Sequence, residues 1–126
     1  MKVITKHICA ASDIGLNGNL FGGKMLSWLD GAGYLLCVET CKSPDLVTVK
    51  FEEVIFRRPV KEGNVISVYG KVLEIGNSSI KVYLEARQCF FTDTLHEKEE
   101  TVTSTTIVFV RINPSSGKAV PIKNER

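Results

Sequence analysis

The chain has 126 residues, 44% of them hydrophobic and 24% charged, which predicts one globular domain of ordinary size. A net charge of +2 is too small to indicate nucleic acid as a partner, and no apolar run approaches the ~20 residues of a membrane span. Residues 1–6 lack the apolar core of a signal peptide, so we expect a cytoplasmic protein without a membrane partner. In that compartment the four cysteines should be reduced and act as small buried hydrophobes.

The predicted elements are one strand, one long helix and four more strands. Residues 2–11 are β-branched in places and predict the first strand, and residues 12–19 form a turn-rich loop. The helix should run from Gly22 to about Lys42, because Pro44 prevents its continuation. Since it is apolar on nearly every face, we expect it to be buried. The remaining strands are predicted at 46–56, 65–75, 79–91 and 101–112, with a bulge at Glu52-Glu53 and a polar loop at 92–99.

Alternation within these strands predicts one apolar face on most of them. Three sets of residues each share a face: Ile66, Val68, Gly70 and Val72; Ile80, Val82, Leu84 and Ala86; and Val102, Ser104, Thr106, Val108 and Val110. The predicted class is therefore α+β, with a long central helix wrapped by a curved antiparallel sheet of five or six strands in a meander. Residues 1–126 form a single domain whose tail, 113–126, is expected to be partly flexible.

A two-layer arrangement of this size leaves the sheet edges and one flank of the helix open. Pairing with a second copy is the simplest way to cover them, so we expect at least a homodimer.

One carboxylate, Asp30, lies in the middle of the predicted helix. A buried acid is costly unless it is paired or functional, so Asp30 is either a structural acid or a catalytic group. Gly23 precedes it by seven residues, which is ~10.5 Å of rise with only ~20° of angular drift. The helix start and the carboxylate therefore share one stripe, together with Leu26, Ser27 and Tyr34.

Three motifs together identify a family resemblance: Asn-Gly-Asn-Leu-Phe-Gly-Gly at 17–23, Phe-Arg-Arg-Pro-Val at 56–60 and Gly-Asn-Ser-Ser at 76–79. The chain resembles the hotdog-fold acyl-CoA thioesterases, above all the small bacterial single-domain enzymes and one domain of the tandem cytosolic enzymes of animals. The resemblance covers nearly the whole chain. It implies hydrolysis of acyl-CoA to a fatty acid and coenzyme A, with no other cofactor and no metal. It also implies dimers with active sites across the subunit interface, often assembled into hexamers as trimers of dimers.

The resemblance also implies roles for individual residues. Asp30 would be the general base or nucleophile, and the amides of Gly23 and Gly22 would polarise the thioester carbonyl. Asn19 matches a site residue of some relatives. Because this chain has a single hotdog unit, it must obtain the other half of its site from a second copy.

The residues themselves support this chemistry. A helix start offers unpaired amides and the positive end of the helix dipole, where charge on a carbonyl oxygen can be stabilised. Asp30 can activate water or attack directly, and we favour water, held in part by Asn19. Asp30 either serves the helix start of another subunit or reaches a substrate that bridges the gap.

Coenzyme A carries phosphates, so the site requires basic residues or backbone donors. Arg57, Arg58 and Lys61 cluster in one predicted turn, and Gly76, Ser78 and Ser79 offer backbone and hydroxyl donors in another. The basic cluster is equally compatible with a solvated turn or an interface salt bridge. Among the helix residues, Met25, Trp28 and Tyr34 are candidates for the acyl channel, whereas Leu29, Ala32, Leu35 and Leu36 are expected in the core. His7 and His96 are expected to be structural or surface residues.

Two other functions remain open. One is a hotdog dehydratase or hydratase, which would use a histidine with an acid. The hydratases carry Asp-x-Asn-x-x-His, but here Asp13 and Asn17 are four apart and no histidine follows nearby. A non-catalytic acyl-CoA sensor or binding module would bind the thioester without releasing thiol.

Overall fold

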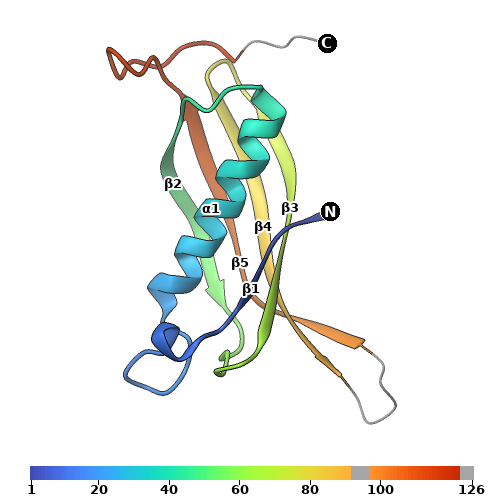
Figure 1. Cartoon of the computed structure of the whole chain (residues 1–126). Helices are drawn as coiled ribbons and strands as arrows, with labels where there is room; N and C mark the ends of the chain where they lie inside the picture. The colour runs from blue at the N-terminus through green and yellow to red at the C-terminus, as the bar shows by residue number, and fades with distance from the viewer. Residues whose placement is uncertain (92–96, 123–126) are drawn as a thin grey trace.

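One long helix lies across one face of a five-stranded antiparallel sheet (Figure 1). The structure, a computed structural model, describes residues 1–91 and 97–122. In chain order its elements are β1 (Lys2–Ile8), the 3₁₀ turn η1 (Ala11–Asp13), α1 (Gly22–Cys41), β2 (Leu46–Phe56), β3 (Val65–Ile75), β4 (Ser79–Phe91) and β5 (Glu97–Arg111). The predicted class, α+β with one central helix, is confirmed.

The strand order is β1-β3-β4-β5-β2, and every neighbouring pair is antiparallel. The predicted meander is correct for β3, β4 and β5 but wrong for β2, which pairs with β5 at the far edge. The connection between β2 and β3, residues 57–64, must therefore cross the end of the sheet. On the way it meets the loop before α1, where Leu20 N donates to Val60 O at 2.8 Å.

The bounds of β2, β3 and β4 are as predicted, but β5 begins at Glu97 rather than at Thr101. The β4–β5 ribbon is longer than expected because its ladder continues through Gln88↔Glu100 and Cys89↔Glu99. Charged residues in this ribbon stay at the surface and find partners there, as when Tyr69 donates to Glu99 at 2.8 Å. The predicted loop residues 92–96, His96 among them, lie outside the described residues.

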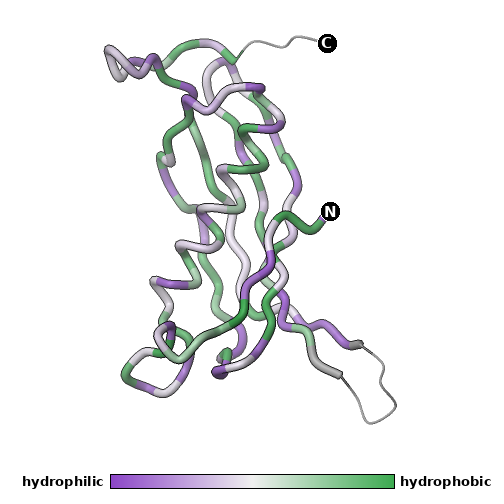
Figure 2. The backbone as a smooth tube through the Cα atoms, viewed as in Figure 1, coloured by the Kyte–Doolittle hydropathy of each residue, from purple (hydrophilic) through white to green (hydrophobic). Residues whose placement is uncertain are grey.

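The helix-facing side of the sheet forms the core. The buried sheet residues are Ile66, Val68, Ile80, Val82, Leu84, Ala86, Val102, Ile107 and Phe109. Leu84, Val82 and Ile80 of β4 pair with Thr105, Ile107 and Phe109, so the odd residues of β5 face the helix. The even residues Thr106, Val108 and Val110 lie on the half-buried outer face. Figure 2 shows the resulting alternation of hydrophobic and hydrophilic residues along the strands.

The buried residues of α1 recur at helical spacing: Met25, Trp28, Leu29, Ala32, Gly33, Leu36, Cys37 and Cys41. Helix and sheet approach closely at Gly33, where a β-carbon would stand 3.0 Å from Cε1 of Phe109. The expectation of burial on every face was wrong for the single chain, because Ser27, Gly31, Leu35 and Glu39 form an exposed stripe. Leu35, predicted in the core, is 46% exposed, whereas Leu29, Ala32 and Leu36 are buried as predicted.

The predicted bulge in β2 is confirmed. Pairing with β5 shifts between Glu52 and Ile55, and Glu53 adopts a positive φ of 49°. The hydroxyl of buried Thr105 donates to the Glu52 carbonyl at 3.2 Å, which satisfies an acceptor that the interrupted ladder leaves free.

Residues 113–122 fold back onto the end of the sheet that lies away from the start of α1. Ile112 bridges Ala119, and Ile122 N donates to Asn77 O at 2.8 Å. The helix ends nearby, where Lys42 at φ 56° donates its amide to Val38 O. The four cysteines form no disulfide; Cys9, Cys37 and Cys41 are buried as predicted, whereas Cys89 is half-buried. In the described part of the chain, no helix is long and apolar enough to cross a bilayer.

Candidate active site

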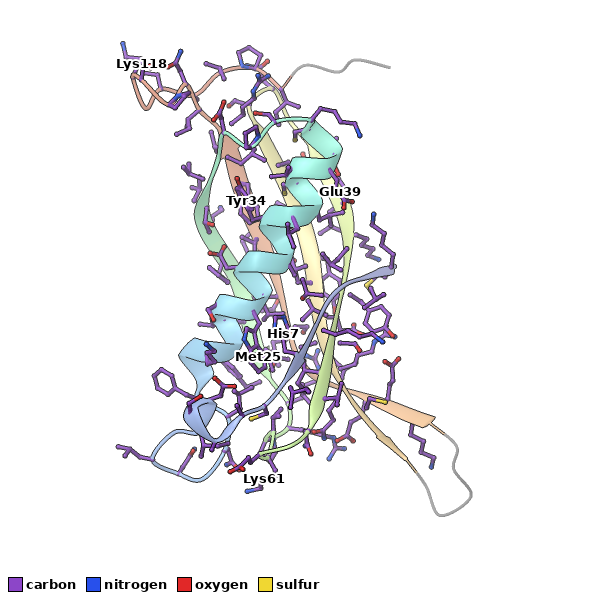
Figure 3. All side chains as sticks on the ribbon, in the orientation of Figure 1. His7, Met25, Tyr34, Glu39, Lys61 and Lys118 are labelled. Carbon is purple, nitrogen blue, oxygen red and sulfur yellow. The ribbon has the colours of Figure 1, made fainter. Side chains whose placement is uncertain are left out.

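A pocket of about 340 Å³ opens at the start of α1. It brings together the loop before the helix, the first helical turn and the β2–β3 connection, which lie far apart in the sequence. Its lining residues are Asn17, Leu20, Gly22, Met25, Phe56, Arg57, Arg58, Pro59, Val60 and Thr103. Met25, which is 2% exposed, gives it an apolar wall, and Figure 3 shows that Met25 and Lys61 lie at the same end of the molecule.

The amides of the first two helix residues differ from those that follow, and of these two residues Gly22 lines the pocket whereas Gly23 does not. Lys24 N and Met25 N donate to Phe21 O at 3.0 and 3.1 Å, whereas no acceptor within residues 1–91 and 97–122 engages the amides of Gly22 and Gly23. A β-carbon on Gly22 would stand 3.5 Å from the Phe56 ring, and one on Gly23 would stand 2.7 Å from the Phe21 ring. Glycine therefore keeps the helix start accessible between two aromatic rings.

Asn19, predicted as a site residue, is held by three hydrogen bonds. Its backbone carbonyl accepts from Gly15 N at 2.8 Å, and its backbone N–H donates to Asn17 Oδ1 at 3.2 Å. Its side-chain Oδ1 accepts from Lys61 Nζ at 2.5 Å. Lys61, predicted as a phosphate ligand, is thus bound to the loop that precedes the helix.

The two arginines of the predicted cluster line the pocket but differ in their partners. Arg57 donates from Nη1 to the hydroxyl of Ser104 at 2.6 Å, which is a neutral acceptor. Arg58 Nε lies 3.2 Å from the carboxylate of Glu100, which compensates its charge. Arg57 is therefore the better placed of the two to attract a phosphate.

Asp30 is half-buried on α1, and its Oδ1 accepts a hydrogen bond from Thr48 Oγ1 at 2.6 Å. It forms no ion pair with any residue that the structure describes. Ser27 donates to Lys24 O instead of to Asp30. Sequence analysis missed Thr48, whose only signal is a hydroxyl between Val47 and Val49 in a valine-rich strand.

Asp30 does not line the pocket of its own chain. Two helical turns, ~10 Å of rise, separate it from Gly22 and Gly23. The structure therefore does not unite these predicted site residues within one chain.

The remaining predicted coenzyme A residues lie at the other end of the sheet, in the β3–β4 turn (Figure 1). Gly76 N donates to Ser79 O, and Ser78 O accepts from Arg111 N, both at 2.8 Å. The length of the strands separates this turn from Arg57 and Lys61, so one chain cannot bring both sets to one phosphate group.

Of the candidates for the acyl channel, Met25 lines the pocket, but Trp28 and Tyr34 do not. Trp28 stacks on His7 with ring centroids 4.5 Å apart, and Tyr34 donates to Pro44 O. Burial and then the charge of Lys24 lower the pKa of His7, which fits the structural role predicted for it. The described residues contain no cluster suited to a metal ion.

Comparison with known families and proteins places the chain. The model of the thioesterase superfamily matches residues 17–88, which include the helix start, Asp30, Thr48 and both predicted coenzyme A turns. An uncharacterized acyl-CoA thioester hydrolase of Haemophilus influenzae is 35% identical over 83 residues, 66% of this chain and 53% of that protein. The acyl-CoA thioester hydrolase YciA of Escherichia coli is 30% identical over 83 residues, 66% of this chain and 62% of that protein. The matches thus span only about half to three fifths of these relatives.

Solved structures match over more of the chain. A hexameric hotdog fold thioesterase of Campylobacter jejuni superposes with a TM-score of 0.86 at 34% identity, covering 98% of this chain and 91% of that one. The mutant enzyme of a hexameric broad-specificity acyl-coenzyme A thioesterase superposes with a TM-score of 0.90 at 28% identity, covering 99% and 88%. The predicted hotdog architecture is confirmed.

Proposed function

The chain belongs to the thioesterase superfamily, and from this premise we propose that it hydrolyses acyl-CoA thioesters to a free fatty acid and coenzyme A. The observation that carries the proposal is the pocket at the start of α1. There the Gly22 amide, which has no acceptor in the described chain, meets the apolar wall of Met25 and the guanidinium of Arg57, which forms no ion pair with a described residue. These are the three groups that a thioester carbonyl, an acyl chain and a nucleotide phosphate require. The names of the relatives support the same substrate class.

In this proposal the thioester carbonyl oxygen lies against the amides of Gly22 and Gly23. Water attacks the carbonyl carbon and gives a proton to Asp30, and negative charge develops on the carbonyl oxygen, where the amides stabilise it. The carbon–sulfur bond then breaks, and the leaving thiolate of coenzyme A takes up the proton. Asp30 as a direct nucleophile is the alternative, and both routes need the carboxylate.

The carboxylate comes from a second copy of the chain. Within one chain Asp30 is ~10 Å of rise from the helix start, so a partner subunit must present its own Asp30 to the pocket. Thr48 holds that carboxylate in one orientation through its 2.6 Å hydrogen bond. We propose a homodimer as the minimum, assembled further into a trimer of dimers, as in the hexameric structural neighbours.

Coenzyme A is bound as part of the substrate, and no other cofactor is proposed. Arg57 is the leading phosphate ligand, and Arg58 and Lys61 add positive charge to the same turn. Gly76, Ser78 and Ser79 of a neighbouring copy supply the second set of donors. Cysteines without disulfides fit the reducing environment of the cytoplasm, where we place the protein.

Thiol release from acyl-CoA by the purified protein tests the proposal. Asp30→Asn should lower kcat by about 100-fold or more, and Thr48→Val by about tenfold, because the first removes the base and the second only its orientation. Glu39→Gln removes a carboxylate from the same helix and is the matched control, since Glu39 is exposed and pairs with Lys2.

Near-normal turnover by Asp30→Asn would refute the assignment. Binding of acyl-CoA by the unaltered protein without thiol release would identify a sensor instead of an enzyme. A panel of acyl chains from acetyl to palmitoyl would then define the substrate.

A further inference from the structure

The hydrogen bond between Lys61 and Asn19 fixes the orientation of the asparagine side-chain amide. A lysine ammonium can only donate, so the atom of Asn19 that faces it at 2.5 Å must be the amide oxygen. The orientation of this amide therefore follows from the chemistry of its partner. The NH₂ group of Asn19 is turned away from Lys61.

The surroundings hold both residues in this arrangement. Leu20 and Val60, the neighbours of Asn19 and Lys61, are joined by a 2.8 Å backbone hydrogen bond, and Val60 is 3% exposed. The backbone N–H and C=O of Asn19 are occupied by Asn17 and Gly15. Across the described chain, no acceptor engages the side-chain NH₂, which leaves it available to a ligand.

The charge of Lys61 adds to this effect. No carboxylate among residues 1–91 and 97–122 lies within ion-pair distance of its ammonium. A positively charged ammonium that donates to the amide oxygen withdraws electron density from the amide and makes its N–H groups better donors. Asn19 thus becomes a polarised donor three residues before Gly22.

We propose that Lys61 is a positioning residue that commits Asn19 to donate to the thioester carbonyl oxygen, next to the amides of the helix start. This rests on the proposed thioesterase activity and replaces the water-holding role that the sequence suggested for Asn19. Lys61 occupies one of the two lone pairs of the Asn19 oxygen and weakens that oxygen as an acceptor for the attacking water. The NH₂ group can only donate, and the thioester carbonyl oxygen gains from every donor as negative charge develops on it.

The test compares two substrates, acyl-CoA and the same acyl group on pantetheine, which lacks the nucleotide phosphates. Removing one donor to a developing oxyanion costs roughly 10²–10³ in kcat, so Asn19→Ala should lose about 100-fold and Lys61→Met, which only releases the amide, about tenfold. A positioning role predicts the same loss of kcat on both substrates. Lys61→Arg should restore turnover, and Lys61→Met should add no further loss in the Asn19→Ala background.

Lys6→Met is the matched control, because Lys6 is exposed on β1 and its ammonium forms no hydrogen bond with the described residues. A rise in KM for acyl-CoA alone would make Lys61 a phosphate ligand and overturn the proposal, as would an unchanged kcat. If the unaltered protein released no thiol from acyl-CoA, the proposed function itself would be refuted.

A readout without turnover keeps these failures apart. In the nitrogen–proton NMR spectrum of the full chain, Lys61→Met should shift the side-chain NH₂ signals of Asn19, and Lys61→Arg should leave them close to their original positions. Signals unmoved by Lys61→Met would overturn the proposal whatever the activity.

Discussion

Loops pack against both the start and the end of α1, but the two regions differ in how far their backbone groups are hydrogen-bonded. At its start, the loop before the helix and the 57–64 connection are joined by Leu20–Val60 and Lys61–Asn19, yet the amides of Gly22 and Gly23 remain unpartnered in the described structure. At its end, Lys42 closes the helix by donating to Val38 O, and residues 113–122 are tied to Asn77. Lys61 and Lys118 lie at these two opposite ends of the molecule in Figure 3.

This difference indicates which end of the helix has hydrogen-bond donors available for a ligand. The start of the helix holds free donors beside an apolar pocket, and its cations Arg57 and Lys61 bond to neutral oxygens. The other end uses its backbone groups internally, as in the β3–β4 turn. Among the described residues, the start of the helix combines unused backbone donors with cations that form no ion pair beside an apolar pocket. At the other end the buried Nε of Arg111 also lacks a partner, but its Nη1 donates to Pro121 O and the backbone groups are bonded to one another. Three measurements test this comparison.

The largest expected effect is on substrate affinity at the start of the helix. Arg57→Glu should raise KM for acyl-CoA by roughly 10- to 100-fold, because hydrogen bonds to charged groups contribute about 1.5–3 kcal/mol. Ser79→Ala, at the other end, removes a neutral donor and should raise KM by only about two- to fivefold. Steady-state kinetics on both variants checks this. Equal effects would mean that the two ends bind coenzyme A equally well.

A smaller effect is expected from alkaline pH towards the end of the helix. Burial, and next the neighbouring Cys41, raise the pKa of the Cys37 thiol to about 12 from the ordinary 9.0. Above pH 9 the unfolded chain loses this proton while the folded chain keeps it. Cys37 therefore lowers the free energy of unfolding as pH rises towards 12, by up to about 1.4 kcal/mol per pH unit.

Urea unfolding under reducing conditions at pH 8, 9 and 10 measures this slope. Cys37→Ala removes the titrating group and should flatten the dependence, whatever it does to absolute stability. An identical slope in the variant would contradict the assignment.

The smallest effect is expected from acid near the start of the helix. The pKa of His7 is lowered by burial and by Lys24, against the opposing charge of Asp13. The unfolded chain therefore takes up a proton near pH 6.5 before the folded chain does, and stability falls as pH drops through the folded pKa. Between pH 7.5 and 5 the unfolding constant should rise more for the unaltered protein than for His7→Gln, by a further factor of less than about ten. Equal losses would show that His7 is not the sensitive group.

Local pattern was enough to predict most elements of this fold. The bounds of β2, β3 and β4, the start of α1 and the bulge at Glu52-Glu53 agree with the structure. Each depends on residues within a few positions along the chain: glycines at the helix start, Pro44 beyond its end, and the alternation of Ile80, Val82 and Leu84. The length of β5 was missed because its first residues are charged, and only pairing with β4 shows that they form a ribbon.

The candidate site divides in the same way. Sequence alone determined the identity of the helix-start glycines, the position of Asp30 and the basic turn, because motif spacing along one helix and one turn is a local property. Only the tertiary structure decided that β2 lies beside β5, that Thr48 bonds to Asp30 and that Lys61 holds Asn19. The Thr48–Asp30 and Lys61–Asn19 hydrogen bonds join residues 18 and 42 positions apart. No periodicity in a sequence specifies which distant groups the fold will bring within hydrogen-bond distance.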